Sequence, residues 1–345
     1  MSRLPTGCPR DAGIVYTPSV MTPFCRRLAQ VARPLCLVAL ASAAAAGCRP
    51  PAEGVAARPT LRVATSFAPF STRLTEEYRR AMPELDIQEQ EASASAPVLR
   101  QIESGTLDFG VVLADDAYRA YFGSGQASAA PSSSAVRAIS LLQPLPIYLL
   151  ARAGSGVHRI EDLKGKVVAV GPENSSVWKL GTLVLKAFDV EPVTVKAMSS
   201  RELAVAGLKD GSLDAIMLPG YVYPEALTEG LLRDGGAYLL PIGGPPVERL
   251  RRDSPFVRVV MIPRDIYPGQ DQIVPTVGID MMIVCRRDLD EALVYRLADQ
   301  LFAVFPRLAR IEATLRFLNL DEAPATPIPL HPGAARYFRE RELSR

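Results

Sequence analysis

Small hydroxyl and amide side chains gather where a predicted strand gives way to a predicted helix. Asn174, Ser175 and Ser176 follow the apolar run 167–171, and apolar residues at helical spacing come next. The free backbone N–H groups at a helix N-terminus converge on one spot and can bind an anion. We therefore expect these three residues to bind a ligand. Capping of the helix is the alternative role for either serine.

Two further places have the same character. Thr65 and Ser66 stand at the end of a strand predicted over 61–65, and Ser95 precedes a helix predicted over 97–104. Ligands of open α/β sheets bind beyond the carboxyl ends of the strands, so we expect these side chains to line the same site. Tyr118 and Tyr221 are candidate aromatic walls, with core packing as the alternative.

Motifs for catalysis are absent from the sequence. It contains no GxxxxGK[ST], HExxH, CxxC or GxSxG pattern, and no Cys/His cluster with zinc spacing. Of the two histidines, His158 lies in a polar loop, and His331 stands between Leu330 and Pro332, where a structural role is the simpler interpretation. We predict a binding protein with no catalytic residue, no metal and no cofactor.

The elements that must position these residues alternate between strand and helix. This alternation predicts parallel sheets with crossover helices. Capping boxes at Ser199-x-x-Glu202 and Asp288-x-x-Glu291 predict two helix starts. Strands are expected over 61–65, 85–90, 109–113, 136–141, 147–151, 166–170, 193–197, 215–218 and 276–284, and helices over 74–82, 97–104, 177–188, 199–211, 288–302 and 308–317.

Two segments of the chain repeat each other. Residues 103–108 (Glu-Ser-Gly-Thr-Leu-Asp) and 209–214 (Lys-Asp-Gly-Ser-Leu-Asp) each combine a helix end, a glycine suited to a left-handed cap, and an aspartate that opens a strand. Their matching places in two similar series predict two lobes of like construction.

Composition agrees with a folded protein of two domains. The chain has 345 residues, of which 48% are hydrophobic and 22% charged. Its net charge of +2 excludes the broad basic field of a nucleic-acid binder.

Residues 1–48 resemble an export signal. Arg26, Arg27 and Arg33 precede an apolar run that ends in Ala-Ala-Gly-Cys48, similar to the sequence at which bacterial lipoproteins are cleaved and lipidated. Cleavage without a lipid is the alternative, and Met21 is a second possible start. Cys285 alone lies beyond Cys48, so no internal disulfide is expected. Residues 49–59, rich in proline, form a predicted tether.

Several motifs resemble the TAXI family, the substrate-binding subunits of tripartite ATP-independent periplasmic (TRAP) transporters. The tail 329–340, Pro-Leu-His-Pro-Gly-Ala-Ala-Arg-Tyr-Phe-Arg-Glu, is close to that family's pattern. The segments 105–110 with Asp115–Tyr118, 161–167, and 266–270 with 276–279 also match. The chain departs from the family at 64–70 and at 172–177, where pocket glycines are missing, and at 113–114, where Leu-Ala stands in place of the usual Gln-Ser.

The resemblance implies a type II periplasmic-binding-protein fold, with two α/β lobes joined by a two-segment hinge near 142–145 and 273–276. Lobe one is expected over 60–142 and 273–345, and lobe two over 143–272. The implied function is extracytoplasmic capture of a solute by lobe closure and delivery to an ion-driven TRAP membrane permease, with the protein held at a membrane through a lipid on Cys48.

A small organic anion or an amino acid is the expected ligand. No arginine lies in the predicted binding loops, and Asp115 and Glu173 would repel a dianion but attract an ammonium group, which favours an amino acid. Two alternatives remain open. One is a lipoprotein sensor or orphan receptor that signals to another protein, and the other is an enzyme such as a dehydratase on the same fold.

Overall fold

Apolar spacing and capping residues decide where the helices begin and end. In the computed structural model, Ser200 caps the helix Arg201–Asp210 (α5) by accepting a hydrogen bond from the N–H of Leu203, and Gly211 ends it in the left-handed conformation (φ 79°). Ser199 was expected to cap this helix, and that prediction is wrong by one residue. The cap is the side chain that reaches the free N–H of the first turn.

The long helix Glu291–Ile311 (α8) shows the same kind of shift. Asp290 caps it by accepting a hydrogen bond of 2.8 Å from the N–H of Leu293, whereas Asp288 was expected. A separate helix from residue 308 was also expected. Residues 308–311 instead form the last turn of α8, although Pro306 lies inside the helix, and 312–317 lie outside the described residues.

The structure describes residues 58–65, 67, 70–92, 94–123, 135–220, 226–311 and 321–343, all within the unit Arg58–Arg345. The predicted leader, Cys48, Ser66, Tyr221 and most of the tether lie outside them. The strands are β1 (Thr60–Ala64), β2 (Asp86–Gln90), β3 (Phe109–Leu113), β4 (Val136–Arg152), β5 (Val167–Val170), β6 (Thr194–Ala197), β7 (Ala215–Pro219), β8 (Ala237–Leu240), β9 (Val257–Ile262) and β10 (Val274–Arg286). The other helices are α1 (Phe70–Ala81), α2 (Ser95–Glu103), α3 (Ala114–Phe122), α4 (Ser176–Ala187), α6 (Ala226–Arg233), α7 (Pro245–Asp253) and α9 (Pro332–Leu343), with a 3₁₀ turn at Ile160–Leu163.

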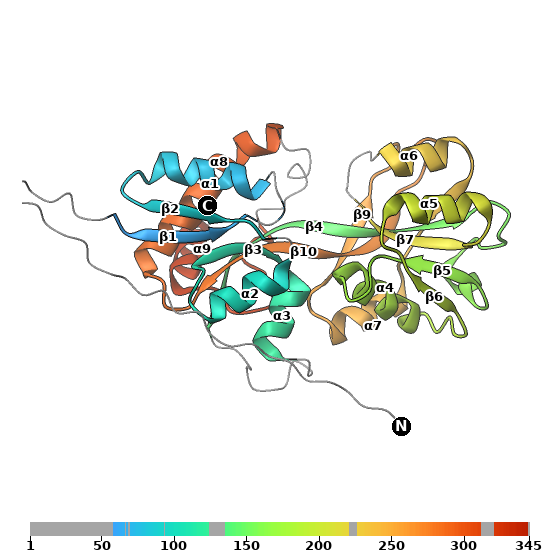
Figure 1. The fold of residues 1–345 in the computed structure, drawn as a ribbon, viewed down its shortest axis with the longest axis horizontal. Helices are drawn as coiled ribbons and strands as arrows, with labels where there is room; N and C mark the ends of the chain where they lie inside the picture. The colour runs from blue at the N-terminus through green and yellow to red at the C-terminus, as the bar shows by residue number, and fades with distance from the viewer. Residues whose placement is uncertain are drawn as a thin grey trace, which may run out of the picture. The chain divides into compact units, whose positions relative to one another are not determined.

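The strands form a continuous path with the order β2-β1-β3-β10-β4-β7-β5-β6 (Figure 1). Parallel pairs join β1 to β2 and β3, and β5 to β6 and β7, while β10 is antiparallel to β3 and β4. We call the part built on β1, β2, β3 and β10 sheet A, and the part built on β5, β6, β7 and β8 sheet B. The α/β class predicted from the sequence is confirmed, but the sheets are mixed and not wholly parallel, because β4, β8, β9 and β10 make antiparallel pairs.

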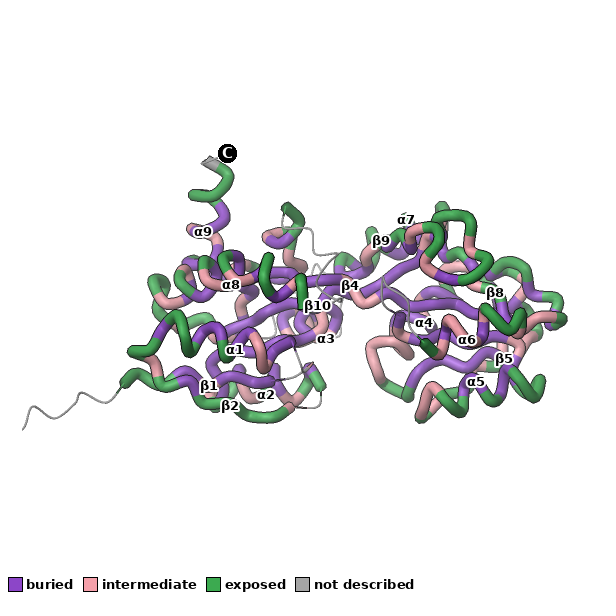
Figure 2. The backbone as a smooth tube through the Cα atoms, turned by 90° about the horizontal axis from the view of Figure 1, so that it is seen from above, coloured by how far each residue is buried: buried purple, intermediate pink, exposed green. Residues whose placement is uncertain are grey.

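The strand β4 takes part in both sheets. Its first part pairs with β10 through Leu145 and Pro146, and its second part, from Ile147, pairs with β7 and β8. Two strands separated by a crossing segment at 142–145 were expected, but β4 is continuous. Pro144 borders a bulge of the ladder, where a missing N–H costs little, and Pro146 is the last residue before β4 changes its partner from β10 to β7. Figure 2 shows β4 and β10 buried along most of their length.

Each face of sheet A has its own hydrophobic core. One core packs α1, α8 and α9 against the sheet through residues such as Phe70, Leu142 and Met281. The other includes Val98 and Tyr118 of α2 and α3 and continues into sheet B. Loops that leave the carboxyl ends of the strands are therefore held on both faces by packed helices.

The repeated aspartates have matching structural roles. Asp108 is 4% exposed in its side chain, and it accepts hydrogen bonds from the backbone and guanidinium of Arg62. Asp214 likewise accepts from Arg152 and from the N–H of Val167. Both lie at the amino ends of strands, so the repeat stabilises the two sheets and is not part of a binding edge.

Candidate functional site

The carboxyl ends of the parallel strands bring Thr65, Ser95 and Asp115 to one edge of sheet A. Ser95 begins α2, and its Oγ accepts a hydrogen bond of 2.9 Å from the N–H of Leu113, the last residue of β3. Thr65 follows β1 directly and is buried, with its N–H donating to the carbonyl of Gln90. These backbone contacts fix the strand ends but leave both hydroxyls committed mainly to structure.

Two carboxylates lie in the first turn of α3, directly after β3. Asp115 is fully buried and accepts a hydrogen bond of 2.6 Å from Nη1 of Arg119, one turn along the same helix. Asp116 lies 3.8 Å from the same guanidinium. Carboxylates at a helix N-terminus are stabilised by the helix dipole.

Sheet B contributes the N-terminus of α4. Ser175 is the cap of this helix, because its Oγ accepts a hydrogen bond of 3.1 Å from the N–H of Trp178. Capping was the alternative role foreseen for one of the two serines. Asn174, just before it, is exposed and has a left-handed backbone (φ 64°), which asparagine tolerates well.

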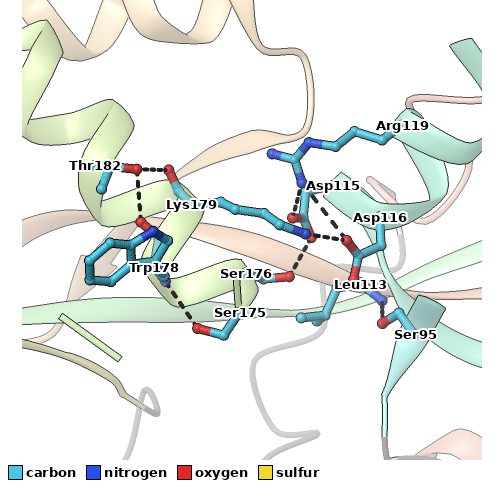
Figure 3. A network of polar contacts seen from close by, with 10 residues as sticks. All are labelled: Ser95, Leu113, Asp115, Asp116, Arg119, Ser175, Ser176, Trp178, Lys179 and Thr182. Carbon is cyan, nitrogen blue, oxygen red and sulfur yellow. Dashed lines mark hydrogen bonds and ion pairs between the residues drawn. The ribbon is translucent and has the colours of Figure 1, made fainter. Parts of the chain in front are cut away.

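The two edges meet through four charged side chains and one hydroxyl (Figure 3). The hydroxyl of Ser176 donates a hydrogen bond of 2.9 Å to Oδ1 of Asp115, and Nζ of Lys179 lies 3.0 Å from Oδ1 of Asp116. We call Asp115, Asp116, Arg119, Ser176 and Lys179 the cross-sheet cluster. It joins the end of β3 to the helix that follows β5.

Electrostatics within the cross-sheet cluster are balanced. Burial raises the pKa of Asp115 above its ordinary value, and the neighbouring charge of Asp116 raises it further. Arg119 and the hydroxyl of Ser176 act in the opposite direction. Two carboxylates and two cations give the cluster no net formal charge.

Tyr118, on α3, packs against other aromatic rings. Its ring is 4.8 Å from that of Phe122 and 5.4 Å from that of Phe256, which also lies under the guanidinium of Arg119 at 5.2 Å. Its hydroxyl is buried with no hydrogen-bond partner. The predicted residues Ser66 and Tyr221 lie outside the described part of the chain.

Sequence reasoning missed Arg119, Lys179 and Arg201. Arg119 stands four residues after Asp115, a spacing that pairs charges on a helix and was available as a signal. Lys179 finds its partner on a distant helix, so no local pattern indicates it. Arg201 begins α5, and its Nη2 donates a hydrogen bond of 2.6 Å to the carbonyl of Pro219, at the carboxyl end of β7.

Neither histidine lies in the cross-sheet cluster. Gly333 donates its N–H to Nδ1 of His331 at 3.2 Å, and Nε2 lies 3.1 Å from the carbonyl of Arg287, so the ring is neutral and holds the start of α9. Burial lowers its pKa. His158 is exposed near the ring of Tyr238. Within the described residues, no three acidic, histidine or cysteine side chains are grouped in a way that would hold a metal ion.

Hollows occur elsewhere on the described surface. One of about 400 Å³ lies between β8 and the loop 268–272, and one of about 530 Å³ lies between α4 and β6. None of the predicted ligand residues lines either hollow. Among the described helices, none is both long and apolar enough to cross a bilayer.

Known proteins resemble this chain over most of its length. Residues 69–341 match the model of the NMT1-like family. Among solved structures, the periplasmic aliphatic sulphonate binding protein SsuA from Escherichia coli is 15% identical, with 83% of this chain and 76% of that chain covered and a TM-score of 0.44. The alkanesulfonate-binding protein SsuA from Xanthomonas axonopodis pv. citri, bound to MOPS, is 18% identical, with 81% and 83% covered and a TM-score of 0.43. The VFT2 domain of Bordetella pertussis BvgS is 14% identical, with 75% and 94% covered and a TM-score of 0.42.

Proposed function

Because the chain belongs to the NMT1-like family, we propose that it is a solute-binding protein that closes two lobes around a small organic anion or amino acid. The observation that carries this proposal is the cross-sheet cluster. Side chains at the carboxyl edges of two sheets reach one another through Ser176–Asp115 and Lys179–Asp116. This is the place where a solute held by both sheets would lie.

The proposed lobes follow the two sheets. Lobe one is assigned to 60–142 and 273–345, and lobe two to 143–272, with hinge segments near 142–145 and 273–276. The shared strand β4 supports this assignment, since it changes partners from β10 to β7 between Pro146 and Ile147. A solute that contacts both lobes stabilises the closed form relative to the open one, and its affinity follows from that difference.

The neutral charge balance of the cross-sheet cluster favours an amino acid. Its ammonium group would pair with Asp115 or Asp116, and its carboxylate would accept hydrogen bonds from Ser176 and the start of α4 or pair with Lys179. Each hydrogen bond to a charged group is worth about 1.5–3 kcal/mol. A dicarboxylate would bring a second negative charge close to the two aspartates. Thr65, Ser66, Ser95, Tyr118, Asn174, Ser175 and Tyr221 remain proposed neighbours of the solute.

Delivery to an ion-driven TRAP-type permease is part of the proposal. It is supported by the motifs at 266–270 and 329–340 that resemble the TAXI family, and by the predicted export signal, in which Cys48 is the predicted site of a lipid anchor. The closed lobes would dock on the permease at the outer face of a membrane.

Titration calorimetry of the purified protein tests the proposal. The probes are the twenty standard amino acids and a set of mono- and dicarboxylates. We expect an amino acid to bind best and Ser176→Ala to weaken it, with Ser212→Ala, at the opposite end of sheet B, as the matched control. Tighter binding of dicarboxylates would refute the amino-acid preference. Absence of binding by every probe would refute capture of an amino acid or small organic anion.

A further inference from the structure

Buried polar atoms without a protein partner are rare in folded chains, and each one calls for an explanation. Among the described residues, three uncharged side chains have such an atom: Oγ of Ser71, Oη of Tyr118 and Oε1 of Gln143. Ser71 is 2% exposed and Gln143 is 5% exposed. Neither of these two was predicted from the sequence to contact a ligand.

Gln143 belongs to the same edge of sheet A as the cross-sheet cluster. Leu113, which immediately precedes α3, pairs with Met281 of β10. On its other side, Met281 faces the bulge of β4 that contains Leu142 and Gln143, because Met282 pairs with Leu141 and Asp280 with Pro144. Gln143 of β4 therefore lies level with Leu113, the last residue of β3, across the sheet.

The amide of Gln143 is almost unused by the protein. Its Nε2 lies 3.8 Å from the sulfur of Met281, which is a weak acceptor, and its oxygen has no partner. An amide has two donors and an acceptor with two lone pairs. A side chain of this kind, buried at the point where β4 passes from one sheet to the other, costs stability unless a bound molecule completes its hydrogen bonds.

Ser71 reaches the same edge from α1. It is the second residue of that helix, which follows the end of β1, and Ala64 at that end pairs with Gly110 of β3. Its carbonyl accepts from Thr75, but its hydroxyl has no partner. Phe70 and Leu74 of α1 share a hydrophobic core with Leu142 and Met281, and Gln143 contacts the sulfur of Met281, so α1 and the amide of Gln143 pack on the same face of sheet A.

We propose that Ser71 and Gln143 hydrogen-bond to the solute, at an uncharged polar group such as a hydroxyl or an amide. This inference rests on the proposed function. It adds a second end to the site: the cross-sheet cluster takes the charged end of the solute, and Ser71 and Gln143 take an uncharged one. The group of the solute that binds here is expected to be uncharged, because the surrounding side chains are apolar. A charged group among Phe70, Leu74, Leu142 and Met281 would lose its hydration without gaining a counter-ion.

Paired variants separate a ligand contact from a structural one. Ser71→Ala and Gln143→Met remove the unpartnered atoms at nearly constant shape. Their controls remove buried hydroxyls that do have partners: Thr75→Val, one turn along α1, where Oγ1 donates to Ser71, and Ser140→Ala, on β4, where Oγ donates to Leu141.

The melting temperature is measured on the protein without added solute. The affinity for the best-binding standard amino acid is measured by titration calorimetry. We expect Ser71→Ala and Gln143→Met to keep or raise the melting temperature of the protein without solute. Each variant should lower the affinity for the amino acid about tenfold. The controls should lower the melting temperature and leave the affinity unchanged.

The inference is overturned if both variants lose thermal stability as the controls do, or if both bind the amino acid as the wild type does. The melting temperatures decide between the two roles even when no amino acid binds. Absence of amino-acid binding by the wild type would count against the proposed function, whereas lost stability in the two variants would refute this inference alone.

Discussion

The pair Lys179–Asp116 allows the idea of lobe closure to be tested without knowing the solute. The two side chains are 32% and 18% exposed, with Nζ 3.0 Å from Oδ1, and they belong to helices that follow strands of different sheets. If the lobes open, this contact must break. Replacing Lys179 by Met or Asp116 by Asn is therefore expected to shift the protein toward the open form.

The size of the shift follows from the exposure of the pair. Two charges about 4 Å apart interact by ~4 kcal/mol at an effective dielectric of about 20, before the cost of dehydration is counted. Exposed pairs retain about 0–1 kcal/mol in measurements. For this partly buried pair we expect about 1 kcal/mol, which changes the ratio of open to closed molecules about fivefold.

Energy transfer between fluorophores at exposed positions 100 on α2 and 209 on α5 measures that ratio. Wild type, Lys179→Met, Asp116→Asn and the double variant form a cycle in which the two single effects should not add. Added salt should shift the wild type toward the open form and leave the double variant nearly unchanged. Identical distance distributions in all four proteins would show that the pair does not hold lobes together, and the reasoning would fail.

Other residues give further predictions. Ser175→Ala should lower the free energy of unfolding in urea by about 1 kcal/mol, because it removes the cap of α4, so a change in Ser175 alone is no clean test of binding; unchanged stability would contradict the capping role. Asp108→Ala should destabilise the chain by about 1–3 kcal/mol, since it removes the hydrogen bonds of Arg62 to a buried carboxylate while Arg62 itself stays 37% exposed, and solute affinity should not change; a loss of affinity with normal stability would place Asp108 in the site instead. Burial lowers the pKa of His331, so its contribution to stability is present above the unfolded pKa of about 6.5 and is lost as the pH falls below it; melting temperatures from pH 8 to pH 5 check this, and a His331→Asn variant should show a weaker acid dependence. Burial raises the pKa of Asp280 to about 7, so its contribution is fully present near pH 4 and is lost as the pH rises through 7; Asp280→Asn should melt above the wild type at pH 8 and close to it at pH 4, and the reverse order would contradict the direction of the shift.

Local patterns in the sequence predicted the parallel βα units well. Apolar strands such as β3 and β5 and glycine-ended helices such as α5 depend on neighbouring residues alone, so their signals are complete in one short segment. Less regular elements were not predicted. The helices α3, α6, α7 and α9 and the strands β8 and β9 have short or mixed patterns, and their positions depend on packing against distant strands.

The candidate site was predicted only in part, for the same reason. Asp115 and Ser176 were both proposed as ligand residues, and the structure brings them together. Two features of the site depend on how the two sheets face each other. One is the complete burial of Asp115 beside Arg119, and the other is the contact of Lys179 with Asp116. The unpartnered atoms of Ser71 and Gln143 are invisible in a sequence, because any serine or glutamine looks the same until its neighbours are known.

The position of β10 between β3 and β4 bears on how the chain is made. On a ribosome, β1, β2, β3 and β4 emerge first, but sheet A has a gap in its middle until the strand ending at Arg286 has been synthesised. Lys179 and Asp116 are in the nascent chain long before that strand, yet they cannot be held in register without it. A polypeptide whose central strand is made this late cannot close sheet A until most of the chain has been synthesised.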